Sequence, residues 1–203
     1  MIKGGEFLIK DQEAKDIFIP EEFGEDQLMM ASATKEFVEK ELDPHREQFE
    51  KKDYQLTEDC MKKAGGLGLL GISVPAEYDG MGMPFNTSVL ICDKISGANG
   101  SFSTAFGAHT GIGTLPILLY GDDAQRKKYL PKLAKGEWMG CYCLTEPGAG
   151  SDANSGKTKA VLTKDGKHYL ITGQKMWISN AGFADVFIVF ARIEDDKNIT
   201  GFI

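Results

Sequence analysis

The sequence has few cysteines and no long apolar run. Its four cysteines form no C-x-x-C pair, and a structural zinc site normally requires such pairs. We therefore expect no metal site and interpret the cysteines as reduced thiols of the core. No apolar stretch approaches the roughly 18–20 residues of a membrane-spanning helix, so we expect no membrane span. The first residues, Met1-Ile2-Lys3-Gly4-Gly5-Glu6, are typical neither of a secretory signal nor of an arginine-rich transit peptide.

Basic residues are scarce relative to acidic ones. The 203 residues include 23 Lys and Arg against 30 Asp and Glu, for a net charge of −7. Because a nucleic-acid-binding protein normally presents a basic surface, we expect no nucleic-acid partner. An anionic ligand is not excluded, since backbone N–H groups can bind phosphate on an acidic protein. The hydrophobic content of 42% is that of an ordinary globular protein with a substantial core.

Helical patterns dominate the first part of the chain. Apolar residues recur at helical spacing over residues 25–49, with an expected break at Asp43-Pro44, because proline disfavours a helical residue before it. Thr57 is a candidate N-cap for the next helix, and Asp122 opens a capping box for the last one. We therefore expect residues 1–136 to form an all-α amino-terminal domain.

After residue 136 the hydrophobic period becomes two, which is typical of strands. An Asp-Gly pair in the middle of this region predicts a hairpin turn. The expected strands cover residues 139–144, 157–163, 168–178 and 186–193, and a further one begins at residue 199. Because the chain ends inside that last strand, we expect it to be a fragment of a longer polypeptide, with residues 137–203 as the start of a second, β-rich domain. The predicted fold class is α+β.

Two glycine-rich stretches must be distinguished. Residues 66–71 fit the G-x-G-x-x-G pattern, but a dinucleotide-binding fingerprint leaves a strand and opens a helix. Here a polar helix precedes the glycines, so we interpret them as the end of that helix and a turn. Residues 148–152, Gly-Ala-Gly-Ser-Asp, lie instead where a strand ends. Glycines there let a phosphate or a flat ring approach the backbone, although an ordinary Pro-Gly turn is the simpler alternative.

A second polar motif follows about one hairpin later. Trp177-Ile178-Ser179-Asn180 places an indole, a hydroxyl and an amide near the end of an expected strand. A lone tryptophan is usually a core residue, but its polar neighbours favour a ligand wall. Its strand can also pair with the strand that carries Thr145, a hydroxyl just before the glycine turn. The two motifs together offer hydrogen bonds and one flat apolar wall, as a flavin requires.

Catalytic groups are harder to assign. His109 lies in a helix of small residues, and such a histidine is usually structural. Glu146 precedes a proline in the glycine turn, so we interpret it as a structural hydrogen-bond acceptor rather than a base. Cys141 and Cys143 are two residues apart in a strand and are expected to share one face. We assign no catalytic residue within the chain.

At these motifs the sequence resembles the acyl-CoA dehydrogenases, over nearly the whole chain. The first family signature matches residues 142–152, Tyr-Cys-Leu-Thr-Glu-Pro-Gly-Ala-Gly-Ser-Asp, and the flavin-flanking strand matches residues 173–180. Residues 107–109, 118–121 and 125–137 are similar to the helical domain before it. The Gly4-Gly5-Glu6-Phe7 stretch and the region of His109 look most like the long- and very-long-chain branch.

The resemblance implies a helical domain, then an antiparallel β-barrel-like middle domain, of which this chain would hold only the start. It also implies FAD as cofactor. By the resemblance, Ser151 additionally contacts the acyl-CoA substrate. The residues expected to line or flank the flavin are Tyr142, Cys143, Leu144, Thr145, Gly150, Ser151, Trp177, Ile178 and Ser179.

The implied reaction is α,β-dehydrogenation of an acyl-CoA thioester to the trans-2-enoyl-CoA, a step of fatty acid β-oxidation. Family members use a glutamate of the carboxy-terminal domain as base, and no residue here corresponds to it, so we expect this chain to be inactive alone. The implied partners are an electron-transferring flavoprotein and further copies of the full-length protein. The expected location is the cytoplasm of a bacterium, or the mitochondrial matrix of a eukaryote.

Three alternatives stay open at this point. An acyl-CoA oxidase would pass its electrons to oxygen, and a non-catalytic relative would keep the fold as a flavin- or acyl-CoA-binding module. An unrelated mixed α/β binding domain would require both flavin motifs to occur together by chance. The sequence also leaves the acyl chain length open.

Overall fold

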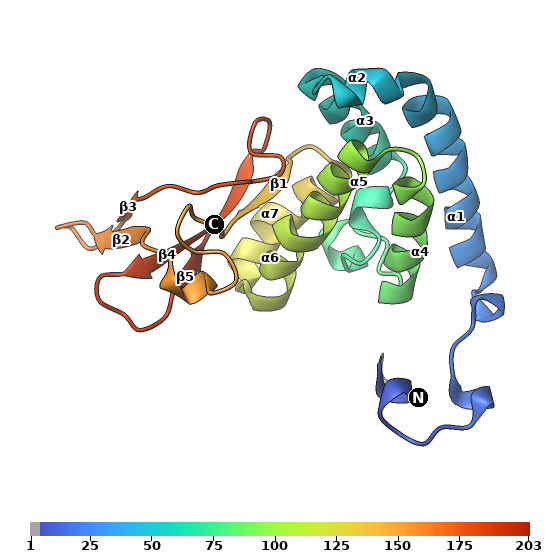
Figure 1. Ribbon diagram of the computed structural model, residues 1–203, viewed down its shortest axis with the longest axis horizontal. Helices are drawn as coiled ribbons and strands as arrows, with labels where there is room; N and C mark the ends of the chain where they lie inside the picture. Colours follow the sequence, from blue (N-terminus) through green and yellow to red (C-terminus); the bar gives the residue numbers. More distant parts are fainter. Residues whose placement is uncertain (1–4) are drawn as a thin grey trace.

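Helices precede strands along the chain, and the two kinds of element occupy opposite ends of the molecule (Figure 1). The computed structural model describes residues 5–203. The first four residues, which include Gly4 of the Gly4–Phe7 stretch and most of the Met1–Glu6 segment, lie outside the described residues. The α+β class predicted from the sequence is confirmed.

The first five α-helices pack around one large apolar cluster. Its most deeply buried members include Leu42, Met61, Ile95 and Phe102. The helices are α1 (Glu25–Phe37), α2 (Arg46–Glu50), α3 (Tyr54–Gly66), α4 (Phe85–Ser96), α5 (Gly100–Gly107), α6 (Leu115–Tyr120) and α7 (Asp123–Lys135). Two π-helical segments, Val38–Leu42 and Ala108–Gly113, continue α1 and α5. Short 3₁₀ turns cover Glu6–Leu8, Ala14–Asp16, Pro20–Glu22, Asp43–His45, Leu69–Gly71, Ala76–Tyr78 and Ala153–Ser155.

Caps and breaks set the helix boundaries. The 3₁₀ turn at Pro44 separates the α1 region from α2, as its sequence predicts. The capping box of Asp122 and Gln125 opens α7. The prediction that Thr57 caps α3 is wrong. Asp53 caps it, because its carboxylate accepts a hydrogen bond from the backbone N–H of Leu56 at 3.0 Å.

The strands form a small mixed sheet in the order β1-β4-β2-β3, with β5 on β4. Strand β4 pairs in parallel with β1 and β2, and antiparallel with β5, whereas the β2–β3 hairpin is antiparallel. The bounds are β1 (Gly140–Cys143), β2 (Lys159–Leu162), β3 (Tyr169–Thr172), β4 (Val186–Ile193) and β5 (Thr200–Phe202). The pairing is thus mixed rather than purely antiparallel, because β1 and β4 run in the same direction and are joined through the hairpin between them.

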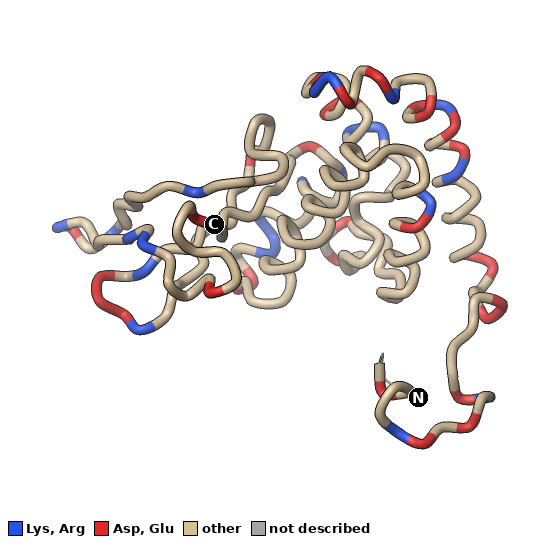
Figure 2. Tube along the Cα trace, viewed as in Figure 1, with Lys and Arg blue, Asp and Glu red and all other residues tan. Residues whose placement is uncertain are grey.

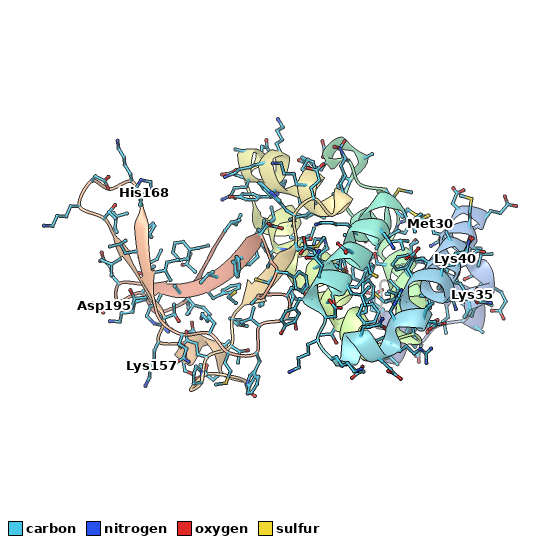
Figure 3. All side chains as sticks on the ribbon, turned by 90° about the horizontal axis from the view of Figure 1, so that it is seen from above. Met30, Lys35, Lys40, Lys157, His168 and Asp195 are labelled. Atoms are coloured by element: carbon cyan, nitrogen blue, oxygen red, sulfur yellow. The ribbon has the colours of Figure 1, made fainter. Side chains whose placement is uncertain are left out.

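A second apolar cluster joins the helices to the sheet. Ile117 of α6 and Leu130 and Leu133 of α7 are buried with Val186 and Ile188 of β4. The uncharged α5 and α6 lie in the middle of the molecule, whereas Lys and Arg alternate with Asp and Glu along α1–α3 (Figure 2). The molecule is elongated, and Figure 3 shows it from above, with Met30 of α1 toward one end and His168 of the hairpin toward the other. Within residues 5–203, none of the helices is both long and apolar enough to cross a membrane.

Candidate functional site

Strand β1 runs directly into the glycine turn. After Cys143 the backbone leaves the sheet, and Glu146 and Ala149 exchange two backbone hydrogen bonds of 3.0 and 3.1 Å across the turn. This small closed turn exposes the residues on either side of Ala149. The turn therefore presents its backbone at the surface, as its position after a strand predicts.

The two glycines of the turn are not required by the protein's own packing. Neither Gly148 nor Gly150 has a positive φ, and a Cβ added at either position would meet no heavy atom within 4 Å. By contrast, a Cβ added at Gly173 would lie 2.7 Å from the Cα of Thr158. The absence of side chains at 148 and 150 keeps an open surface beside the turn, which suits the close approach of a flat ring or a phosphate.

The second motif forms a turn with two left-handed residues. Trp177 has φ 61° and Asn180 has φ 67°. Left-handed backbone is uncommon for an indole-bearing residue, and such strain concentrates at functional sites. The Trp177 side chain is 84% exposed, although an indole of this size is usually packed. The predicted strand over residues 168–178 is wrong beyond Thr172, where β3 ends and the backbone leaves its pairing with β2.

Three hydrogen bonds join the second motif to the first. The backbone N–H of Met176 donates to the carbonyl oxygen of Thr145 at 2.9 Å. The ammonium of Lys175 donates to the carbonyl oxygen of Leu144 at 3.0 Å and to the carboxylate of Glu146 at 2.8 Å. The expected pairing of the two segments is therefore real, but it is a short contact rather than a strand ladder. Nothing in the residue pattern identified Lys175 as part of this contact.

Glu146 is the buried anchor of the turn. Its carboxylate also accepts hydrogen bonds from the backbone N–H groups of Lys157, at 2.6 Å, and Thr158, at 3.0 Å. Burial alone would raise the pKa of Glu146, but the hydrogen bonds from Lys175, Thr158 and Lys157 lower it to about 2. A carboxylate held in this way is a weak base at neutral pH. The interpretation of Glu146 as a structural acceptor agrees with this geometry.

The structure places the predicted flavin-lining residues on the two segments that meet at this contact, but not all of them on one face. Gly150, Ser151 and Trp177 are exposed, and Leu144, Thr145, Ile178 and Ser179 are half-buried near the contact between the two motifs. Within the part of the chain that the structure describes, the hydroxyls of Thr145, Ser151 and Ser179 make no hydrogen bond. Tyr142 packs on Phe190, whereas Cys143 faces the core beside Cys141, with the two sulfur atoms 3.8 Å apart.

A cavity of about 270 Å³ lies between α5 and the second motif. Its walls include Thr104 and Ala105 of α5 and the segment 178–183. The side-chain amide of Asn180 donates to the Ala105 carbonyl at 2.9 Å and holds this segment against the helix. The second motif therefore continues onto the helical part of the molecule.

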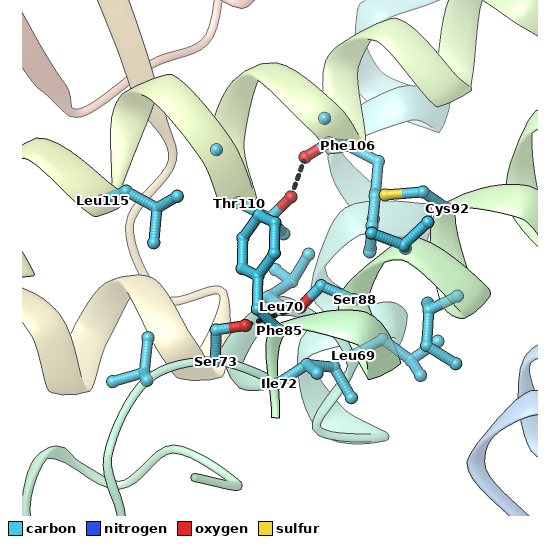
Figure 4. Close-up of a pocket in the computed structure, with 15 residues that line it drawn as sticks. Leu69, Leu70, Ile72, Ser73, Phe85, Ser88, Cys92, Phe106, Thr110 and Leu115 are labelled. Atoms are coloured by element: carbon cyan, nitrogen blue, oxygen red, sulfur yellow. Dashed lines mark hydrogen bonds between the residues drawn. The ribbon is translucent and has the colours of Figure 1, made fainter. Parts of the chain in front are cut away.

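A second cavity, of about 220 Å³, lies between α4, the 69–74 segment and the continuation of α5 (Figure 4). Its walls are almost entirely apolar. The few polar groups are satisfied locally, since the hydroxyls of Ser73 and Ser88 are 2.6 Å apart and Thr110 donates to the Phe106 carbonyl at 2.9 Å. An aliphatic group is the chemistry that this cavity accepts.

Among residues 5–203, no group of three or more His, Cys, Asp or Glu side chains is arranged to hold a metal ion. His109 is buried and hydrogen-bonded to backbone groups, which agrees with its interpretation as a structural residue.

Comparison with known proteins matches two family descriptions to the chain. "Acyl-CoA dehydrogenase, N-terminal domain" covers residues 24–137, and "Acyl-CoA dehydrogenase, middle domain" covers residues 141–203. The chain belongs to the acyl-CoA dehydrogenase family. The resemblance in the sequence motifs is thereby confirmed.

Individual relatives agree with this assignment. A probable acyl-CoA dehydrogenase of Bacillus subtilis (strain 168) is 49% identical over 195 residues, which are 96% of this chain and 33% of the relative. The human mitochondrial very long-chain specific acyl-CoA dehydrogenase is 46% identical over 136 residues, 66% of this chain and 21% of that protein. A crystal structure of an acyl-CoA dehydrogenase complexed with FAD from Bacillus anthracis has a TM-score of 0.94 and 46% identity over 100% of this chain and 35% of that chain. Nearly the whole of this chain is therefore matched, but it spans only about a third of the length of these bacterial relatives.

Proposed function

We propose that the full-length protein is an FAD-dependent acyl-CoA dehydrogenase that forms trans-2-enoyl-CoA in fatty acid β-oxidation. The observation that carries the proposal is the contact between the two motifs. It places the open glycine turn beside the exposed Trp177, joined by the 2.9 Å hydrogen bond between Met176 and Thr145. An acyl-CoA oxidase would use the same arrangement and remains the alternative.

The residues at this contact fit a flavin. The open faces of Gly148 and Gly150 leave room for the ring or its phosphates, and the hydroxyls of Thr145 and Ser179 are free to bond polar ring atoms. The exposed indole of Trp177 supplies an apolar wall. We propose that Leu144, Ile178 and Gly150 complete this surface, that Ser151 reaches both cofactor and substrate, and that Tyr142 and Cys143 act by holding β1. A bound flavin supplies a hydride acceptor for oxidation of a Cα–Cβ bond.

The proposal places no catalytic base in this chain. The carboxylate nearest the contact is Glu146, and its pKa of about 2 and its buried hydrogen bonds make it unsuited to remove a proton at neutral pH. Its role is to hold the turn that carries Gly150. We infer that the base belongs to the carboxy-terminal part of the full-length protein, so this chain alone is inactive.

The apolar cavity supports an acyl group as substrate. Gly107 and Thr110 line it, and they follow Ala105, which contacts Asn180 of the second motif. The helical segment that contacts the second motif at Ala105 therefore also lines the cavity, whose walls Figure 4 shows. We propose that the cavity receives the aliphatic end of the acyl chain, as a long-chain substrate would require.

The proposal also covers organisation and partners. Residues 1–136 would form the amino-terminal helical domain and residues 137–203 the start of the middle β-domain. The full-length protein would act as a homo-oligomer, in the bacterial cytoplasm or the mitochondrial matrix, and pass electrons to an electron-transferring flavoprotein. The family assignment supports each of these expectations.

The deciding experiment is an anaerobic visible spectrum of the full-length protein titrated with palmitoyl-CoA. We expect a flavin band that bleaches as substrate is added. A band that does not bleach would favour another chain length or a non-catalytic relative, and a protein without flavin would refute the proposal. Oxygen consumption during turnover separates an oxidase from a dehydrogenase.

The assigned surface is tested by the FAD content of Thr145→Ala and Trp177→Ala. Both changes should weaken FAD binding. Tyr120→Ala is the matched control, because Tyr120 is 86% exposed on α6 and belongs to neither motif. Equal FAD content in all three variants and the unmodified protein would remove the site assignment.

A further inference from the structure

Gly140, the first residue of β1, is held by two side chains from outside the sheet. Its backbone N–H donates to Nδ1 of His109 at 3.0 Å, and its carbonyl oxygen accepts from the side-chain amide of Asn180 at 3.3 Å. Among the strands of residues 5–203, β1 pairs only with β4, so these side chains take the place of a second neighbouring strand at Gly140.

The hydrogen bonds of His109 fix its tautomer. Because the Gly140 N–H is a donor, Nδ1 must accept, and the proton must lie on Nε2. Nε2 then donates to the Leu133 carbonyl in the last turn of α7 at 3.0 Å. The side chain is completely buried, and burial lowers the pKa of His109 to about 4. His109 is therefore a neutral bridge between α7 and β1, with one hydrogen bond at each nitrogen.

Asn180 makes the corresponding connection from the other side. Its buried amide donates both to Gly140 and to the Ala105 carbonyl of α5, at 2.9 Å. Asn180 also ends the Trp177 turn in a left-handed conformation, which asparagine adopts more readily than most residues. The backbone position of this turn therefore depends on the same glycine that His109 holds.

Close backbone contact leaves little freedom at this junction. A Cβ added at Gly113, in the π-helical segment that carries His109, would lie 2.8 Å from the carbonyl carbon of Gly140. The helix and the strand therefore touch without an intervening side chain. Because this contact is close-packed, a displacement of His109 also displaces Gly140, and the reverse.

We propose that His109 and Asn180 are positioning residues that set β1 and the Trp177 turn relative to each other through Gly140. Gly140 lies five residues before Thr145, and Asn180 lies three residues after Trp177, so the bridge supports the parts of the chain on both sides of the candidate flavin surface. This inference rests on the proposed function, because its consequence is the geometry of the flavin site.

The test uses the full-length protein with FAD, comparing His109→Leu with His109→Gln. Leucine fills the space but makes no hydrogen bond, whereas glutamine offers one acceptor and one donor. We expect about a 10-fold weaker FAD affinity and an altered visible circular dichroism of the bound flavin for His109→Leu, with substantial recovery for His109→Gln. Thr34→Val is the control, since it removes a buried side-chain hydrogen bond, to the Met30 carbonyl, in α1. At a similar loss of thermal stability, it should leave the flavin signal unchanged.

A double-mutant cycle tests the connection through Gly140. Asn180→Gly keeps the left-handed backbone but removes the amide, and its own effect on FAD affinity should resemble that of His109→Leu. If both side chains act through Gly140, the double variant weakens FAD binding by clearly less than the product of the two single effects. Strictly multiplicative effects, or a His109→Leu variant that binds FAD as the Thr34→Val control does, would overturn the inference. Failure of the unmodified protein to bind FAD would instead refute the proposed function.

Discussion

The ammonium of Lys175 lies 2.8 Å from the carboxylate of Glu146, and both side chains are nearly buried, with exposed fractions of 13% and 7%. This ion pair joins two segments that are 29 residues apart and that each carry half of the candidate flavin surface. Lys175 also donates to the Leu144 carbonyl, so it is tied to the first segment at two points. The pair is therefore the main polar connection between the glycine turn and the Trp177 turn.

Replacing Lys175 with methionine should destabilise the protein strongly. The methionine fills a similar volume but leaves the Glu146 carboxylate buried without its counter-ion, and breaking a buried pair in this way costs about 3 kcal/mol or more. The urea-unfolding midpoint of the full-length protein measures the effect. Lys35→Met is the control, because the ion pair between Lys35 of α1 and Glu39 of the π-helical segment that follows is largely exposed. Equal midpoints for the two variants would contradict the role assigned to Lys175.

The residue pattern predicted one half of this pair. Glu146 could be interpreted as an acceptor, because it precedes a proline within a turn and turn geometry is local. Lys175 could not be recognised, since nothing in its neighbourhood distinguishes it from a lysine on a solvated strand. The partner of Lys175 is set by the path of the backbone after β3 ends at Thr172, where Gly173 lies close against Thr158. That long-range contact cannot be read from the residues around Lys175.

The difference between local and distant interactions also explains which parts of the fold could be predicted from the sequence. The end of α3 at the glycines, the break at Pro44 and the β2–β3 hairpin follow from local chemistry and were predicted. The parallel pairing of β4 with β1 joins residues 46 apart in the sequence, and periodicity cannot specify such a partner. Likewise, the inward orientation of Cys143 follows from alternation along β1, but which face is covered depends on the helices behind it.

The buried, neutral His109 should make the protein lose stability as the pH falls. Burial lowers its folded-state pKa from 6.5 to about 4, so between these values the unfolded chain binds a proton that the folded chain does not. The free energy of unfolding that depends on a neutral His109 is therefore fully present above about pH 6.5. It falls by up to about 3 kcal/mol as the pH drops toward 4. His109→Gln should therefore lose less stability than the unmodified protein between pH 7 and pH 5 in urea unfolding. His168→Gln, at the exposed end of the hairpin, should follow the unmodified curve, and parallel curves for all three proteins would contradict the prediction.

Alanine substitutions at Gly150 and Gly173 should distinguish an effect on FAD affinity from an effect on the stability of the fold. Gly150→Ala adds a methyl group into open space, so thermal stability should be nearly unchanged while FAD affinity falls. Gly173→Ala places its methyl group 2.7 Å from the Cα of Thr158 and should destabilise the fold by about 2 kcal/mol. Differential scanning fluorimetry with and without added FAD measures both effects. Normal FAD affinity in Gly150→Ala would show that the open turn is not a cofactor surface.

Filling the apolar cavity should change the preference for acyl chain length. Gly107 lines the cavity, and a side chain there begins in open space, so Gly107→Leu should fold at least as well as the unmodified protein. The leucine occupies room that we assign to the end of a long acyl chain, so the KM for palmitoyl-CoA should rise about 10-fold while that for butyryl-CoA stays the same. Gly66→Leu controls for the general effect of leucine at an open helical glycine, because Gly66 is exposed at the end of α3, outside the cavity. An equal change for both substrates, or no change for either, would mean that the cavity does not receive the chain.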